Sequence, residues 1–126
     1  MKLRHLFTVN IFFAAFFGIS CSLFPAWVLR IYGLGSNDAA IWTTRLVGGS
    51  ILGLATLMWF GRSSADRDAR RAIALALCVQ DLVGTLASIE IQLRGGINTF
   101  GWSNPILYGL LTLAYLYFLF VRPADS

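Results

Sequence analysis

Charged residues, histidine and cysteine are all scarce in this chain of 126 residues. Only 13% of the residues are Asp, Glu, Lys or Arg, and there are one histidine and two cysteines. Soluble domains carry about 25% charged residues, so this composition excludes an ordinary soluble fold. There is no CxxC spacing, and no zinc, Walker, Rossmann or nucleophile-elbow pattern occurs. The sequence therefore indicates a non-catalytic protein without a metal site or a cofactor.

Long apolar stretches dominate the chain, since 57% of its residues are hydrophobic. A helix needs about 20 apolar residues to cross a bilayer. Four stretches approach that length: Leu6–Phe24, Ile41–Phe60, Ala72–Leu93 and Pro105–Val121. The segments between them are rich in Gly, Ser, Asn and Asp, which break helices. We therefore predict an all-α fold, an integral membrane four-helix bundle in which residues 1–126 form one domain.

The basic residues predict the orientation of this bundle. Most of them precede the first span, lie between the second and third, or follow the fourth: Lys2, Arg4, Arg62, Arg67, Arg70, Arg71 and Arg122. Because loops on the cytoplasmic side are enriched in Lys and Arg, we expect both termini to be cytoplasmic, in a bacterial inner membrane. Anionic lipid beside these residues accounts for the net charge of +4, so no nucleic-acid partner is predicted.

The first span is rich in phenylalanine, and a proline ends it. We interpret the phenylalanines as a surface for lipid and packing rather than a pocket for an isoprenoid or a pigment. A strip of small residues that includes Ala14, Gly18 and Cys21 marks the inward side of this helix. After Pro25, the aromatic and aliphatic residues around Trp27 predict a short helix lying in the membrane interface.

The second span combines an arginine with glycines. A helical wheel places four residues on one face: Arg45, Gly48, Gly49 and Gly53. Gly49 and Gly53 form a GxxxG pair, a spacing that lets another helix approach closely. A charged side chain within a membrane helix usually faces the interior of the bundle. We therefore expect Arg45 and these glycines to pack helices together, with Gly84 of the third span in a similar role.

Asp81 is the most unusual residue of the chain, because it lies about 15 Å beyond the start of the third span. A carboxyl at that depth should face the bundle interior, and it is either a functional group or a hydrogen-bonded packing residue. Thr112 and Tyr115 of the fourth span lie at a similar depth. We expect a protonated Asp81 to donate a hydrogen bond to one of them or to a backbone carbonyl. Together, Asp81, Thr112 and Tyr115 form the predicted ligand-binding group.

Residues 25–34 and 44–59 resemble small four-helix bacterial membrane proteins of the DoxX-like kind. The shared pattern is PAWVLRIYGL followed by TRLVGGSILGLATLMW. A more distant likeness is to the membrane scaffold family of ergosterol biosynthesis, in which an Arg-Leu-Gly run also opens a helix. These groups are largely non-catalytic or uncharacterised. The resemblance therefore implies a four-helix membrane fold and a packing role for Arg45.

Three functions remain open. The first is a structural or accessory subunit, a scaffold that packs against other membrane subunits or associates with itself. The second is a binder or carrier of an apolar small molecule, such as a quinone, an isoprenoid or a lipid, with Asp81 in its pocket. The third is a proton-linked transporter, for which a single carboxyl in the middle of the membrane is slender support. The absence of a recognisable site favours the accessory subunit.

Overall fold

In this computed structural model the described residues, 2–121, fold into five α-helices and two short helical turns, with no strand among them. The elements are α1 (Leu3–Leu23), α2 (Pro25–Ile31), α3 (Asp38–Gly61), α4 (Arg67–Leu93), the 3-10 turn η1 (Thr99–Trp102), α5 (Ser103–Leu116) and the π-helical turn η2 (Tyr117–Val121). The predicted all-α fold is confirmed. Arg122, which contributed to the predicted orientation, lies outside the described residues.

Four helical segments are long and apolar enough to cross a membrane: Leu3–Leu23, Asp38–Gly61, Arg67–Leu93 and Thr99–Val121. Each of them overlaps one of the predicted spans. The short helix predicted after the first span is α2. Most of the surface of the long helices is apolar, as expected if lipid surrounds them; Phe12, for example, is 73% exposed.

Side chains at the start of two long helices explain where these helices begin. The side chain of Asn37 accepts a hydrogen bond from the Ala40 amide (2.8 Å) ahead of α3. Asp66 accepts hydrogen bonds from the Asp68 amide (3.0 Å) and the Ala69 amide (3.3 Å) at the start of α4. Such caps satisfy amides that have no partner within the helix. They extend α3 and α4 several residues beyond the apolar stretches.

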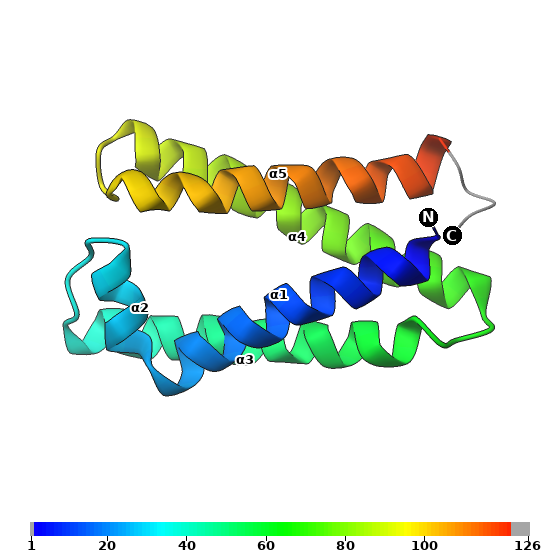
Figure 1. Ribbon diagram of the computed structural model, residues 1–126, viewed down its shortest axis with the longest axis horizontal. Helices are drawn as coiled ribbons and strands as arrows, with labels where there is room; N and C mark the ends of the chain where they lie inside the picture. Colours follow the sequence, from blue (N-terminus) through cyan, green and yellow to red (C-terminus); the bar gives the residue numbers. More distant parts are fainter. Residues whose placement is uncertain (1, 122–126) are drawn as a thin grey trace.

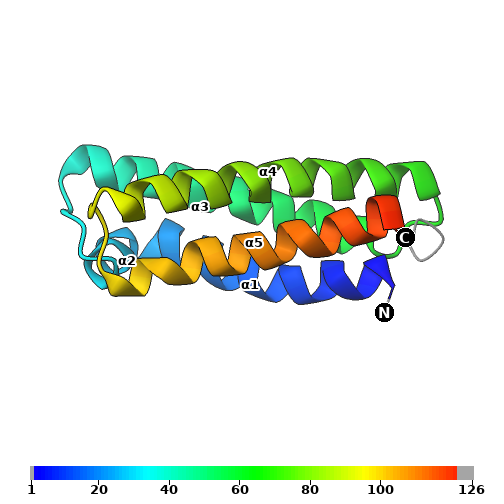
Figure 2. The ribbon, with the colours of Figure 1, turned by 90° about the horizontal axis from the view of Figure 1, so that it is seen from above.

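The long helices form two pairs, which Figure 1 shows as two layers. α1 packs along α3, and α4 packs along α5, whereas the pairs contact each other much less. The four helices run roughly along one axis (Figure 2). α4 slants toward the α1–α3 layer at one end of the bundle, where α1 begins and η2 ends (Figure 1). We call this the terminal end, and the opposite end, which carries α2, the α2 end.

Buried side chains gather into two clusters. The large cluster draws on α1, α3, α4, α5 and η2, and it includes Phe7, Met58, Leu77, Tyr115 and Leu119. The small cluster lies at the α2 end and comprises Cys21, Val28 and Tyr32, with Phe17, Leu34 and Ile97 packed against it. The two clusters do not share a buried residue. The helix pairs are therefore joined firmly at the terminal end and more loosely elsewhere.

α1 and α3 approach each other closely at two glycines, Gly18 and Gly48. A Cβ atom added to Gly48 would lie 2.8 Å from the Gly18 carbonyl oxygen and 2.5 Å from the hydroxyl oxygen of Ser22. No side chain larger than hydrogen fits there without movement of the backbone. Gly18 and Gly48 are thus the small residues that let these two helices pack.

The predicted packing of Gly49, Gly53 and Arg45 inside the bundle is wrong. A Cβ atom added to Gly49 or Gly53 meets nothing within 4 Å among the described residues. Arg45 is exposed as well. α3 is apolar around most of its circumference, so its sequence pattern did not define which side faces inward. Arg45 lies in the second turn of α3, and its long side chain can reach the membrane surface from there.

Candidate functional site

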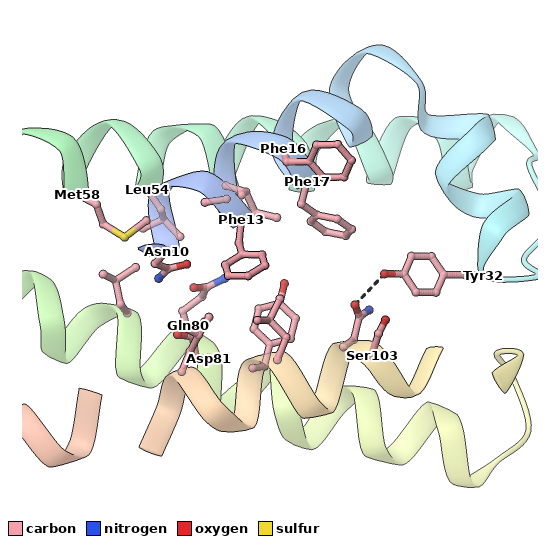
Figure 3. Close-up of a pocket in the computed structure, with 17 residues that line it drawn as sticks. Asn10, Phe13, Phe16, Phe17, Tyr32, Leu54, Met58, Gln80, Asp81 and Ser103 are labelled. Atoms are coloured by element: carbon pink, nitrogen blue, oxygen red, sulfur yellow. Dashed lines mark hydrogen bonds between the residues drawn. The ribbon is translucent and has the colours of Figure 1, made fainter. Parts of the chain in front are cut away.

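A cavity of about 340 Å³ lies between the α1–α3 pair and the α4–α5 pair. Figure 3 shows its lining, with Phe13 and Phe17 of α1 pointing toward the side chains of α4 and α5. Apolar groups predominate in this lining. The polar side chains are few: Asn10, Tyr32, Gln80, Asp81, Ser103, Asn104 and Tyr108. A mainly apolar cavity with a few polar groups is the usual form of a small-molecule site.

Hydrogen bonds between elements border the cavity at each of its ends. Toward the terminal end, the side-chain amide of Asn10 on α1 donates to the hydroxyl of Tyr115 on α5 (2.7 Å). The Tyr115 hydroxyl in turn donates to the sulfur of Met58 (3.7 Å). Toward the α2 end, the Tyr32 hydroxyl donates to the side-chain oxygen of Asn104 (2.8 Å), drawn as the dashed line in Figure 3. The two helix pairs are therefore tied on either side of the space between them.

Tyr32 and Asn104, which this hydrogen bond joins, line two cavities. Both residues also line a second cavity of about 180 Å³, which extends toward α2 and the first turns of α3. Burial raises the pKa of the Tyr32 hydroxyl above its ordinary value of 10.0. This hydroxyl therefore keeps its proton and remains a hydrogen-bond donor at neutral pH.

The position of Tyr32 depends on the loop between α4 and α5. The side chain of Asn98 donates to the Ile31 carbonyl (2.7 Å), and the Asn98 amide donates to the Tyr32 carbonyl (3.2 Å). Gly33, which follows, has a φ of 73°, a conformation that only glycine adopts readily. The C-terminal end of α2 is thus held against the α4–α5 pair, although α2 belongs to the α1–α3 side of the chain.

Asp81 lies in the lining of the cavity, near the middle of α4. It is about 21 Å from Arg67 and about 18 Å from Leu93 along the helix axis. Only 2% of its surface is exposed. Its Oδ2 atom is buried and has no hydrogen-bond partner among residues 2–121. A buried carboxyl oxygen without a partner is costly, so an additional group that could approach Oδ2 would be favoured.

The predicted group of Asp81, Thr112 and Tyr115 does not come together as a site. The Thr112 hydroxyl donates to the Tyr108 carbonyl of its own helix (2.8 Å), and Tyr115 is bonded to Asn10 and Met58. Neither residue lines the cavity. The expected hydrogen bond from Asp81 to either hydroxyl is therefore wrong, because both hydroxyls have other partners. Of the three predicted residues, Asp81 alone faces the cavity.

Tyr108, Asn104 and Tyr32 line the cavity but were not predicted as site residues. The first two share a face of the fourth span with Thr112, so the spacing could have indicated them. No pattern indicates Tyr32, because it reads as one of several aromatic residues at the membrane surface. α5 begins at Ser103, and the side-chain oxygen of Asn104 accepts the hydrogen bond from Tyr32.

Gly84 lies one turn along α4 from Asp81 and faces the ring of Tyr108. A Cβ atom added to Gly84 would lie 3.5 Å from that ring, in ordinary van der Waals contact. The ring of Tyr108 is therefore held against α4 close to Asp81. Glu90, another acid of this helix, is exposed and forms an ion pair with Arg94 (2.9 Å).

Within the described part of the chain, no group of three or more His, Cys, Asp and Glu side chains could hold a metal ion. Cys21 and Cys78 are both buried and are not joined by a disulfide. His5 accepts a hydrogen bond from the Lys2 amide (3.0 Å) at the start of α1. The chemistry available in the cavity is accordingly one carboxyl group, three amides and several hydroxyls.

Comparison with protein-family models, with characterised proteins and with solved structures gives no match. The resemblance of residues 25–34 and 44–59 to the DoxX-like proteins therefore remains a prediction. Any function must be argued from the cavity and from the helix surfaces themselves.

Proposed function

We propose that this protein binds an apolar small molecule with a polar head in the cavity between its two helix pairs. The observation that carries this proposal is that Asp81 lines the cavity and that its buried Oδ2 atom has no hydrogen-bond partner among the described residues. A ligand head placed at Asp81 would supply that partner. The surrounding apolar lining would hold the hydrocarbon part of the ligand.

The cavity has a volume suited to such a ligand. Small-molecule pockets usually measure about 300–1,000 Å³, and this cavity, at about 340 Å³, lies at the lower end of that range. It therefore suits a compact head with part of a chain rather than a whole phospholipid. Phe13 and Phe16 line the cavity and are 49% and 71% exposed, so it reaches the surface of the bundle along α1. The remaining hydrocarbon chain can extend into the surrounding lipid there.

Purification from native membranes tests this function. The protein is isolated in a mild detergent, and the small molecules that remain bound are extracted and weighed by mass spectrometry. Leu54 lines the cavity, whereas Leu57 of the same helix is 45% exposed and does not line it. We expect Leu54→Trp to fill the cavity and to lose the bound molecule, and Leu57→Trp to retain it. Equal retention by both variants, or no bound molecule in the unmodified protein, would contradict the proposal.

The second candidate is a structural or accessory subunit. The observation that favours it is the outward face of α3, where Gly49 and Gly53 leave the helix backbone uncovered by the described residues. Another membrane helix could pack closely against such a face. Co-purification of a stable protein partner, lost in Gly53→Leu and retained in Leu54→Trp, a change on the cavity side of α3, would support this function. For either function we propose an inner-membrane location with cytoplasmic termini, on the basis of the distribution of Lys and Arg.

A further inference from the structure

In the described part of the chain, the lining of the cavity contains an acidic side chain and no basic one. Asp81 is the only carboxyl group among the described residues that line it, and none of those residues is Lys, Arg or His. The described salt bridge of α4 joins Glu90 to Arg94 on the exposed surface. Asp81 therefore faces the cavity without a basic side chain in the lining. This arrangement determines which kinds of ligand head the cavity can accept.

A negatively charged head does not fit this site. A phosphate or carboxylate placed in the cavity would approach Asp81 while no basic side chain of the lining offsets either charge. Charged groups inside the membrane persist when they pair with an opposite charge, and like charges in one buried site oppose each other. The lining thus disfavours fatty acids and the head groups of anionic lipids.

Aromatic rings distinguish a cationic head from a neutral one. Five aromatic side chains line the cavity: Phe13, Phe16, Phe17, Tyr32 and Tyr108. The face of an aromatic ring attracts a cation, most strongly where water is excluded. The contact with Gly84 holds the ring of Tyr108 close to Asp81. A carboxyl group and an aromatic ring therefore lie beside the same part of the cavity.

We infer that the ligand head is a cation, an alkylammonium group whose nitrogen pairs with Asp81 while its carbon substituents contact the aromatic rings. This inference rests on the proposed function, since it requires that the cavity hold a ligand. The Oδ2 atom gains an opposite charge as its partner, and the alkyl chain leaves past Phe13 and Phe16 into the lipid. A neutral hydrogen-bonding head, such as a quinone, gains neither the ion pair nor the attraction of the rings.

Three probes with the same ten-carbon chain test the head group: decyltrimethylammonium, decyl methyl ether and decyl sulfate. The full-length protein is placed in phosphatidylcholine nanodiscs, and radiolabelled probe is measured by equilibrium dialysis. Empty nanodiscs correct for partition into lipid. We expect saturable binding of the ammonium probe, binding of the ether that is at least about tenfold weaker, and no saturable binding of the sulfate. The fixed charge of the ammonium probe ensures that pH changes do not alter it.

Variants assign the binding to Asp81. Asp81→Asn keeps the size of the side chain and removes the carboxyl group that can ionise beside a cation, so we expect it to weaken binding of the ammonium probe about tenfold or more and to change binding of the ether less than about twofold. Glu90→Gln, which removes an exposed acid of the same helix, should leave both unchanged. Thermal unfolding of each variant in the same nanodiscs verifies that it is folded.

The possible failures are distinguishable. The inference of a cationic head is wrong if the ether binds as tightly as the ammonium probe, or if Asp81→Asn binds the ammonium probe as well as the unmodified protein does. In either case the cavity remains a ligand site. If none of the three probes binds saturably, the proposed function fails together with the inference. Preferential binding of the sulfate would overturn the argument from charge.

Discussion

The side chain of Asn10 donates a hydrogen bond to the hydroxyl of Tyr115 across 105 residues of sequence, at a distance of 2.7 Å. This bond joins α1 to α5, and therefore the two helix pairs, at the terminal end of the cavity. Both residues are buried, with 6% and 0% of their surfaces exposed. The hydrocarbon of a bilayer offers no hydrogen-bond partner, so the two polar side chains satisfy each other.

Tyr115→Phe tests this connection. The change keeps the ring contact with Phe7 (6.1 Å between centroids) and removes the hydroxyl that Asn10 and Met58 share. We expect it to lower the free energy of unfolding by about 0.5–2 kcal/mol, the range for a buried hydrogen bond in such proteins. Thermal unfolding in detergent measures the effect. Tyr117→Phe, at an exposed position of η2, is the matched control; an equal effect there would contradict the assignment.

Gly48 and Gly49 are adjacent in sequence but lie in opposite environments. Gly48→Ala places a methyl group against the Gly18 carbonyl and Ser22, so we expect destabilisation of about 1–3 kcal/mol from overpacking. Gly49→Ala meets nothing within 4 Å in the described chain and should be neutral or stabilising by up to about 1 kcal/mol, because alanine favours helix. The thermal midpoints of the Gly48→Ala and Gly49→Ala variants, compared with that of the unmodified protein, test both expectations. The reverse order would mean that α3 is rotated relative to the structure.

Asp81→Leu should abolish binding of the ammonium probe without lowering the free energy of unfolding. The Thr112 and Tyr115 hydroxyls have other partners, so the change leaves neither of them unsatisfied. It also removes a buried oxygen that has no partner in the described chain. We therefore expect the free energy of unfolding to stay constant or to rise by about 1–2 kcal/mol, while binding of decyltrimethylammonium is lost. A clear loss of stability would show that Asp81 has a structural hydrogen bond after all.

Tyr32→Phe should accelerate exchange of a bound molecule. The change removes the hydrogen bond to Asn104 between two residues that line both cavities, and it leaves the ring contact with Phe100 (5.3 Å between centroids) in place. We expect faster dissociation of decyltrimethylammonium, by about threefold to tenfold, if that bond contributes about 0.5–1.5 kcal/mol to closure. Stopped-flow displacement by excess unlabelled probe measures the rate. The Tyr117→Phe variant should dissociate at the original rate.

Arg45→Leu should be tolerated, contrary to the role expected from the sequence. Arg45 is exposed on the outward face of α3, and it forms no salt bridge with the described residues. Replacing Arg45 by leucine therefore takes no partner away from a buried charged group of the described residues. We expect a change in the free energy of unfolding within about 0.5 kcal/mol. A larger loss, measured together with the oligomeric state by light scattering, would indicate that Arg45 contacts a second subunit.

The amino-acid sequence by itself determined that this protein is an all-α bundle with four apolar spans, because length and apolar composition govern which helices can cross a bilayer. It also identified the inward side of α1, where Ala14, Gly18 and Cys21 are buried, and that of α4 around Asp81. In each of these helices the small or polar residues lie on one side of an otherwise bulky apolar surface. The contrast is strong enough to define the rotation of the helix.

The tertiary structure alone decided the rotation of α3 and the composition of the cavity. α3 has glycines on two neighbouring sides, and only the approach of Gly18 selects Gly48 over Gly49 and Gly53 as the contact. The partners of Tyr115, Thr112 and Asn104 were equally undetermined, since each group has several acceptors or donors at a similar depth. Those choices depend on how the α1–α3 and α4–α5 pairs meet. Because the pairs meet over few residues, a cavity remains between them and Asp81 faces it without a partner.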